Sequence, residues 1–192
     1  INNPNCGWFY TKNQKDFNKI PGNNIGYWLS DKSVDLFKKP RYYENSFSSP
    51  GIRTGRDDIF IRYWQEINWK DYEKPYEISG VMNINKGKWF NITRGGEYRK
   101  WYGHNWFIIN GENNFEYIKK ICPDYRLRDD RYYFKEGVTW TMITSSKTAF
   151  RLCEGGVLYG NGGPAIYNDY TYETLGFFNT KIANYLLNVL NP

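Results

Sequence analysis

Aromatic side chains are the strongest constraint on how this chain can fold, because they account for 20% of its 192 residues. Val, Leu, Ala and Met are scarce by comparison, so large planar side chains have to fill the core. A core of this size does not need so many aromatics, and we expect some of them to remain on the surface. The length favours a single domain, with two small domains as the alternative.

The charge pattern limits the classes of protein to consider. Charged residues make up 24% of the chain and are mixed in sign, which argues against bulk disorder. Lys and Arg outnumber Asp and Glu by 26 to 20, a net charge of +6 that permits a nucleic-acid partner without establishing one. No run of about 18 apolar residues occurs, so no membrane span is expected. The chain opens on neither Met nor a signal peptide, as expected for an excised fragment of a larger cytoplasmic protein.

Several kinds of catalytic or metal site lack support in the sequence. Cys6, Cys122 and Cys153 match no disulfide framework and no CxxC metal pattern, so we expect free thiols in a reducing cytosol. His104 is the single histidine, so no site can be built around a second one, and it lies in a Gly-His-Asn segment that is typical of a turn. The sequence contains no Asp/Glu-x-Lys triplet, so the common nuclease arrangement has no support. Residues 160–165 fit a loose GxGxxA pattern, but Pro164 and a strand-like segment follow where a dinucleotide site needs a helix.

Periodicity predicts an α+β fold, with a curved, mostly antiparallel sheet, flanking helices and a long C-terminal helix. We expect helices over residues 14–19, from the N-cap Ser30 to about 37, over 113–121 and over 171–190. Strands are expected at 59–67, 88–92, 106–109, 132–134, 138–143, 149–153, 157–159 and 165–167, the later ones as a meander. Residues 41–58 and 70–80 are expected to be loops. We interpret residues 1–24 as an N-terminal extension and residues 25–192 as one domain.

The first candidate binding segment comprises residues 50–58, in which two glycines flank Arg53 and Thr54, and Arg56 follows the second glycine. Glycines around a threonine allow backbone amides to approach a phosphate closely. The two arginines would add charge-assisted hydrogen bonds. The alternative is an ordinary turn that leads into a strand, with its charges solvated.

The second candidate segment, residues 86–102, is the densest basic stretch and interleaves cations with aromatics. Such a mixture suits phosphate contacts combined with base stacking or groove wedging. The candidate DNA contacts in this segment are Lys88, Arg94, Arg99, Lys100, Trp101 and Tyr102. The alternative is a solvated strand edge whose aromatics belong to the core. A third basic stretch, residues 119–135, also carries three aspartates and is expected to be solvated surface.

Several blocks, taken in chain order, resemble one protein family. They are GIRTG at 51–55, GGEYRKWYG at 95–103, IINGEN at 108–113, FKEGVTW at 134–140 and LGFFNTK at 175–181. Their order is similar to the C-terminal half of the PglX family, the adenine-specific DNA methyltransferases of BREX phage-defence systems. The chain departs from the family at residues 56–58, where an Asp-Asn pair is more usual, and at residues 159–163, where a small-Ser-Ser stretch is more usual.

The resemblance implies a parent protein that methylates N6 of an adenine in a short asymmetric site with S-adenosylmethionine. Such enzymes carry an (Asn/Asp/Ser)-Pro-Pro-aromatic loop for the flipped adenine, and this sequence has no Pro-Pro dipeptide. We therefore expect a target-recognition domain that binds double-stranded DNA against the catalytic domain of the same parent. We expect no catalytic, metal-binding or cofactor-binding residue in this chain.

In this interpretation the candidate residues have separate roles. Arg94, Arg99 and Lys100 contact phosphate or a guanine edge. Residues 53–56 make a second, positioning contact. Trp101 and Tyr102 either wedge beside the extruded base or pack against the protein.

Other functions remain open at this point. One is the specificity part of a fused restriction endonuclease–methyltransferase of a restriction–modification system. A second is a carbohydrate-binding module, suggested by the Trp and Tyr content. A third is a docking surface for another defence-system protein.

Overall fold

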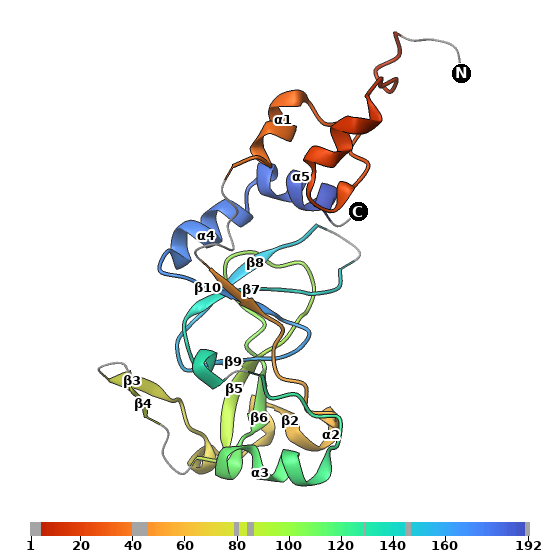
Figure 1. The fold of residues 1–192 in the computed structure, drawn as a ribbon. Coiled ribbons are helices and arrows are strands. Elements are labelled where there is room, and N and C mark those ends of the chain that lie inside the picture. The colour runs from red at the N-terminus through yellow and green to blue at the C-terminus, as the bar shows by residue number, and fades with distance from the viewer. Residues whose placement is uncertain are drawn as a thin grey trace. The chain divides into compact units, whose positions relative to one another are not determined.

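The computed structural model describes residues 5–39, 46–78, 81–83, 87–128, 130–144 and 147–190, with backbone only for 76–78 and 81–83. The chain divides into two compact units (Figure 1). Unit 1 comprises residues 1–44 and 181–192, and unit 2 comprises residues 45–180. The domain boundary expected after residue 24 falls inside unit 1.

Unit 1 is a small helical unit built from both ends of the chain. It contains the 3-10 helices η1 (Gln14–Lys19) and η2 (Pro21–Asn23) and the helices α1 (Asp31–Leu36) and α5 (Lys181–Leu190). Its buried core consists of Ile20, Leu29, Val34 and Val189. Ser30 caps α1 as predicted, because its Oγ accepts a hydrogen bond of 3.2 Å from the Ser33 N–H. The predicted helix over 14–19 is confirmed as η1.

Unit 2 contains two four-stranded sheets. The first has the order β1 (Phe47–Ser49), β10 (Ala165–Tyr167), β7 (Gly137–Trp140) and β8 (Phe150–Cys153), and every pair is antiparallel. The second has the order β2 (Ile61–Tyr63), β6 (Phe107–Asn110), β5 (Trp89–Thr93) and β9 (Leu158–Tyr159). In the second sheet only the β5–β9 pair is parallel. The predicted α+β class with mostly antiparallel pairing is therefore confirmed.

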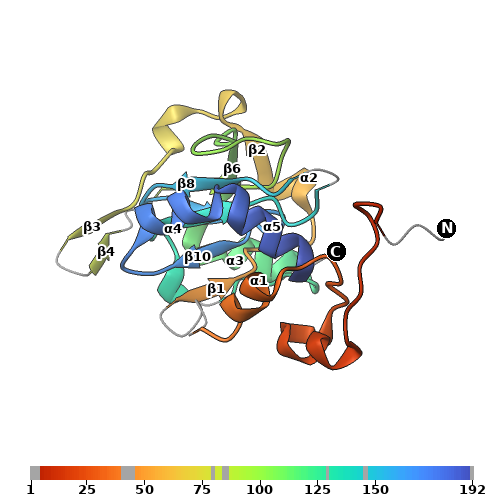
Figure 2. The ribbon, with the colours of Figure 1, turned by 90° about the horizontal axis from the view of Figure 1, so that it is seen from above.

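The remaining elements of unit 2 surround these sheets. They are α2 (Asp57–Phe60), η4 (Trp64–Glu66), η5 (Trp69–Asp71), β3 (Tyr76–Ile78), β4 (Val81–Asn83), α3 (Glu112–Ile121), η6 (Asp130–Tyr132) and α4 (Thr171–Phe178). Strands β3 and β4 form a hairpin that projects from the rest of unit 2 in both ribbon views (Figures 1 and 2). Helix α3 packs on the second sheet, because Phe115 and Ile118 share a buried core with Phe60, Phe90 and Ile109.

Several predicted elements differ from the structure. Only residues 61–63 of the strand expected at 59–67 form a strand, because the short helix α2 occupies residues 57–60 and the 3-10 helix η4 follows at Trp64. The strand expected at 132–134 is a 3-10 turn, η6, that ends at Tyr132. The loops expected at 41–58 and 70–80 contain β1 and β3, although residues 41–45 lie outside the described residues. The meander is broken because β9 leaves it to pair with β5.

The long C-terminal helix expected over 171–190 is two helices, α4 and α5, which meet at Asn179 and Thr180. The buried Asn179 side chain accepts a hydrogen bond from the Phe150 N–H at 3.1 Å and donates one to the Phe150 C=O at 2.9 Å. It also donates to the Leu175 C=O at 3.1 Å. These bonds end α4 against β8.

Candidate nucleic-acid interface

A groove of about 440 Å³ in unit 2 brings together segments that are distant in the sequence. Its lining comes from residues 52–55 and Asp57, from Ile61 in β2, from Ile92 in β5 and Arg94 after it, and from residues 160–162 after β9. Backbone hydrogen bonds of 2.8 Å hold its base, from Asn161 N to Ile52 O and from Gly160 N to Thr93 O. The first and second basic stretches of the sequence therefore meet at one groove.

Close backbone packing explains one of the glycines beside this groove. A Cβ on Gly51 would lie 2.1 Å from the Tyr159 carbonyl oxygen, so no other residue fits there without a shift of the backbone. Gly55 has φ of +80°, a conformation that favours glycine. The loop at 51–55 is thus fixed by packing as well as by its own turn.

Asp57 is the centre of the hydrogen bonds at the groove. Its Oδ1 accepts a hydrogen bond of 2.5 Å from the Thr54 hydroxyl, and its Oδ2 accepts one of 2.5 Å from Arg94 Nη2. The Arg94 guanidinium also lies over the Phe107 ring, 5.3 Å from the centroid. Thr54 is only 1% exposed, so its hydroxyl serves this network and the turn rather than a ligand in solution.

Arg56 has a different environment from the other arginines near the groove. Its Nε and Nη2 donate to the two carboxylate oxygens of Asp58 at 2.9 and 2.7 Å. Hydrogen bonding to Arg56 lowers the pKa of Asp58, which keeps the pair charged. Both nitrogens that would form a fork toward a phosphate are therefore occupied within the protein.

An exposed basic edge runs beside the groove and is formed by Arg53, Arg126 and Arg128. Arg53 and Arg126 lie directly opposite each other, since each N–H donates to the other's C=O at 2.9 and 2.8 Å. Like charges in such a pair repel each other and cost stability. Arg128 Nε reaches the Gly51 C=O at 3.3 Å. In the described part of the chain, none of the three makes an ion pair with a carboxylate.

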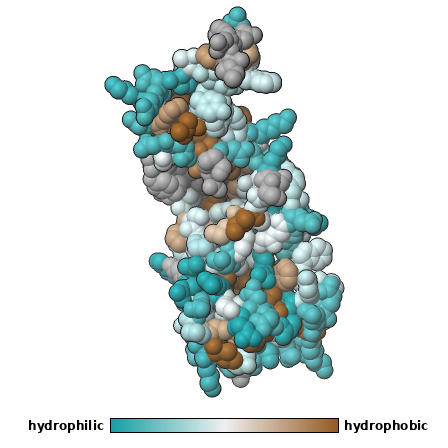
Figure 3. All heavy atoms as spheres, turned by 90° about the vertical axis from the view of Figure 1, so that its right-hand side faces the viewer, coloured by the Kyte–Doolittle hydropathy of each residue, from teal (hydrophilic) through white to brown (hydrophobic). Residues whose placement is uncertain are grey.

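Arg126 and Arg128 were missed by the sequence analysis, which interpreted residues 119–135 as solvated surface. They are exposed, but backbone pairing places Arg126 beside Arg53, more than 70 residues away in the chain, and Arg128 is bonded to Gly51. Figure 3 turns the α2 side of unit 2 toward the viewer, and the surface there is mostly hydrophilic with a few hydrophobic patches. No local sequence signal reveals a pairing between such distant segments.

The loop of residues 95–104 presents a second set of candidates. Tyr98, Trp101 and Tyr102 are each about half exposed, which contradicts the alternative that they belong to the core. Trp101 has φ of +76° and is fixed by its backbone, with its N–H donating to Phe150 O and its C=O accepting from Leu152 N. Arg99 is exposed, and its side chain has no hydrogen-bond or ion-pair partner among the described residues.

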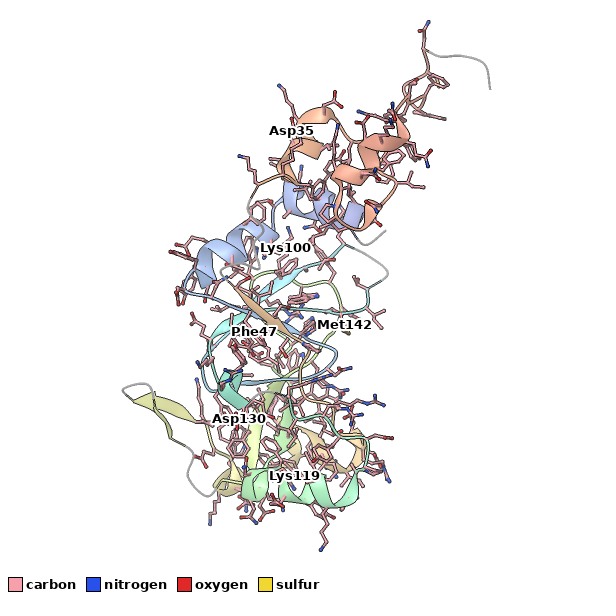
Figure 4. The ribbon with its side chains drawn as sticks, viewed as in Figure 1. Asp35, Phe47, Lys100, Lys119, Asp130 and Met142 are labelled. Carbon is pink, nitrogen blue, oxygen red and sulfur yellow. The ribbon has the colours of Figure 1, made fainter. Side chains whose placement is uncertain are left out.

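Two predicted contacts have structural partners elsewhere. Lys100 Nζ donates to the Asn179 C=O at 2.6 Å, beside the end of α4 (Figure 4). Lys88 Nζ lies 3.5 Å from Glu112 Oε2. Lys88 directly precedes β5, whereas Arg94 directly follows it. Six residues of strand span roughly 20 Å, so the structure does not bring Lys88 to the groove.

His104 and Arg151 support the loop of residues 95–104 from beneath. His104 is buried and bonds through Nε2 to the Glu97 C=O at 2.8 Å. Arg151 is fully buried, and its two terminal nitrogens lie 3.4 Å from Arg99 O and Thr141 Oγ1. Burial lowers the pKa of both side chains. Neither role was predicted from the sequence.

Other kinds of site are not formed by the part of the chain that the structure describes. No three His, Cys, Asp or Glu side chains gather there to hold a metal ion. The glycine run at 160–163 connects β9 to β10 with no helix after it, so it does not fit a nucleotide or S-adenosylmethionine loop. Cys6, Cys122 and Cys153 are free thiols, as expected. None of the described helices has the length and apolar character needed to cross a bilayer.

Two curated relatives that match the chain along its whole length are both adenine-specific methyltransferases. One is PglX of Lacticaseibacillus casei (strain Zhang) and the other is BrxX of Escherichia coli O9:H4 (strain HS), and each is 33% identical to this chain. The chain spans 17% of the first relative and 15% of the second. These matches confirm the resemblance to PglX methyltransferases. No family model matches the chain.

Proposed function

We propose that this chain is the target-recognition domain of a site-specific DNA adenine-N6 methyltransferase of a phage-defence system. It binds duplex DNA and reads the site, and it does not transfer the methyl group itself. The observation that carries the proposal is the basic edge of Arg53, Arg126 and Arg128 beside the groove. Unpaired arginines that repel one another cost stability, and a polyanion removes that cost.

The proposal divides the surface of unit 2 between two kinds of contact. The basic edge neutralises phosphates, which supplies affinity that does not depend on sequence. The half-exposed Tyr98, Trp101 and Tyr102 offer ring faces for stacking or wedging, and Arg99 adds a free cation among them. The flipped adenine and S-adenosylmethionine belong to a catalytic domain of the same parent, since the glycine run at 160–163 leads into a strand and does not fit the cofactor.

A second candidate function is protein docking, and a specific observation favours it. Trp64, Trp69 and Trp106 are all at least one-third exposed. The Trp64 and Trp69 rings are 6.1 Å apart, and the Trp64 N–H donates to the Trp106 C=O. Such a cluster of exposed aromatics suits contact with another protein surface, either in the same parent or in another defence protein.

A salt series on mixed-sequence duplex DNA tests the proposed function. The logarithm of the affinity is expected to fall linearly with the logarithm of the salt concentration, with a slope of about −0.9 per neutralised phosphate. Arg53→Ala and Arg126→Ala should each reduce the size of that slope by about one. Lys32→Ala in unit 1 removes the same charge at a residue that is not part of the basic edge, and it should leave the slope unchanged.

Two results would refute DNA binding by this edge. One is no measurable affinity for the duplex at low salt. The other is a slope that stays the same in Arg53→Ala and Arg126→Ala. In the first case the tryptophan cluster becomes the surface to test, by Trp69→Ala in a binding assay with the catalytic domain of the parent.

A further inference from the structure

We infer that Arg94 reads a guanine base, whereas the unpaired arginines of the basic edge contact phosphates. The inference rests on the proposed function, because it assumes that the chain binds duplex DNA. Beyond the proposed function, the inference names the residue that determines specificity at one base pair and the base that this residue selects.

Arg94 is held in one orientation before any ligand arrives. Asp57 accepts a hydrogen bond from its Nη2 at 2.5 Å, and the Phe107 ring lies under its guanidinium at 5.3 Å. Asp57 is fixed in turn by the Thr54 hydroxyl at 2.5 Å, and Thr54 is buried. A side chain that is already ordered loses little entropy on binding, which favours directional contacts.

The charge around Arg94 favours a neutral ligand over an anionic one. A phosphate placed at its guanidinium would lie close to the Asp57 carboxylate and be repelled by it. A guanine presents two neutral acceptors, O6 and N7, whose spacing matches the arginine fork. Arg53 and Arg126 make no ion pair with a carboxylate among the described residues, so a phosphate bound to either of them replaces no such pair.

Arg94 lines the groove and keeps donors that Asp57 does not occupy. Only its Nη2 is bonded to Asp57, and its side chain is 34% exposed at the groove. Gly55, Gly160 and Gly162 line the same groove and leave part of its wall without side chains. Arg56 is the contrasting case, since Asp58 occupies two of its nitrogens. Arg94 is therefore the arginine that can present a fixed fork to the edge of a base pair.

The test selects bound molecules from a duplex DNA library with a randomised central segment, using the chain and its variants at one salt concentration. The wild-type chain should enrich guanine at a fixed position. Arg94→Ala and Arg94→Lys should both reduce that preference by roughly 5- to 150-fold, the discrimination of one bidentate contact. Arg94→Lys keeps the charge, so the salt slope of this variant should match that of the wild type. The melting temperature of the variant shows whether it is folded.

Three further variants separate reading a base from general affinity. Asp57→Asn frees Arg94 and removes a negative charge, so it should weaken the guanine preference while raising affinity for mixed-sequence DNA. Arg56→Ala is the matched control, a neighbouring arginine paired with an aspartate, and it should keep the preference. Arg53→Ala should keep the preference and lower only the salt slope.

The inference is overturned if Arg94→Ala retains the guanine preference and loses about one unit of salt slope, as expected for a phosphate contact. It is also overturned, with DNA binding still standing, if the wild-type chain binds the library but enriches no guanine. Failure of the wild-type chain to bind any duplex instead refutes the proposed function, and this inference falls with it.

Discussion

Two buried nitrogen-containing side chains, His104 and Arg151, determine the conformation of the loop that carries the exposed aromatics. The His104 ring fills the space beside Gly96, where an added Cβ would lie 2.7 Å from ring atoms. Arg151 lies under the Arg99 carbonyl, and Thr141 Oγ1 joins it to the Gly96 C=O at 2.9 Å. A buried arginine without a carboxylate is costly, and these acceptors offset part of that cost.

His104 predicts a specific dependence of stability on pH. Burial lowers its pKa below the ordinary value of 6.5, so in that range the unfolded chain binds a proton that the folded chain does not. The free energy of unfolding should therefore fall as the pH falls below 6.5, by at most about 1.4 kcal/mol per pH unit. Above pH 6.5 both states are neutral at this site and the contribution is absent.

Urea denaturation between pH 7.5 and 5.5 measures this effect against His104→Asn. Asparagine tolerates the positive φ of 65° at this position and does not titrate. The chain has one histidine, so the difference between the two stability curves isolates its titration. Curves that stay parallel throughout this range would show that His104 is not desolvated in the folded chain.

At the scale of elements, Asn179 decides where the last helix of unit 2 ends. Asn179→Ala removes three hydrogen bonds and leaves the buried Phe150 N–H without its acceptor. We expect a loss of roughly 2–4 kcal/mol in the free energy of unfolding, since an unsatisfied buried group costs about 1–3 kcal/mol and a net hydrogen bond about 1 kcal/mol. Asn105→Ala, at an exposed position, is the matched control and should change stability by no more than about 0.5 kcal/mol.

Chemical denaturation of both variants checks this prediction. A loss for Asn179→Ala no greater than that for Asn105→Ala would mean that the α4 end does not depend on the side-chain amide. In that case the stacking of Phe150 on Phe178, with ring centroids 4.8 Å apart, would be the main contact.

The break at Asn179 also shows what periodicity can and cannot predict. An apolar stripe continues across residues 175–189, so the sequence pattern predicts one helix, while the bonds that end it come from a strand 29 residues earlier. The short helix α2 escapes prediction for a different reason, because four residues are too few to show a helical period. Strands flanked by glycines, such as β7 and β10, were predicted because their signals are local.

The candidate site was predictable to the same extent. Arg53 and Arg94 carry local signals, a glycine-flanked turn and a basic stretch rich in aromatics, and the structure places both at one groove. Whether a cation is free or paired depends on non-local contacts. Those contacts pair Arg94 with Asp57 across 37 residues and place Arg126 beside Arg53.

At the scale of the whole chain, charge is distributed unequally between the two units. Unit 1 holds eight Lys and Arg against four Asp and Glu, a net +4, and unit 2 holds eighteen against sixteen, a net +2. The unit with the candidate interface thus has the smaller net charge. Its proposed affinity for DNA depends on where its cations lie, not on their excess.

Residues 45–180, expressed alone, should therefore bind duplex DNA with the same salt slope as the whole chain. Every arginine of the basic edge lies in unit 2, as do Asp57 and Asn179 with their hydrogen-bond partners. At physiological salt a charge further than about 8 Å from a phosphate is largely screened, so the charges of unit 1 contribute to the slope only through direct contact. The comparison is made with one duplex over one salt series, after circular dichroism has shown that the fragment is folded. If the folded fragment shows a slope smaller by two or more, unit 1 itself contacts the phosphate backbone, and its lysines become the next residues to replace.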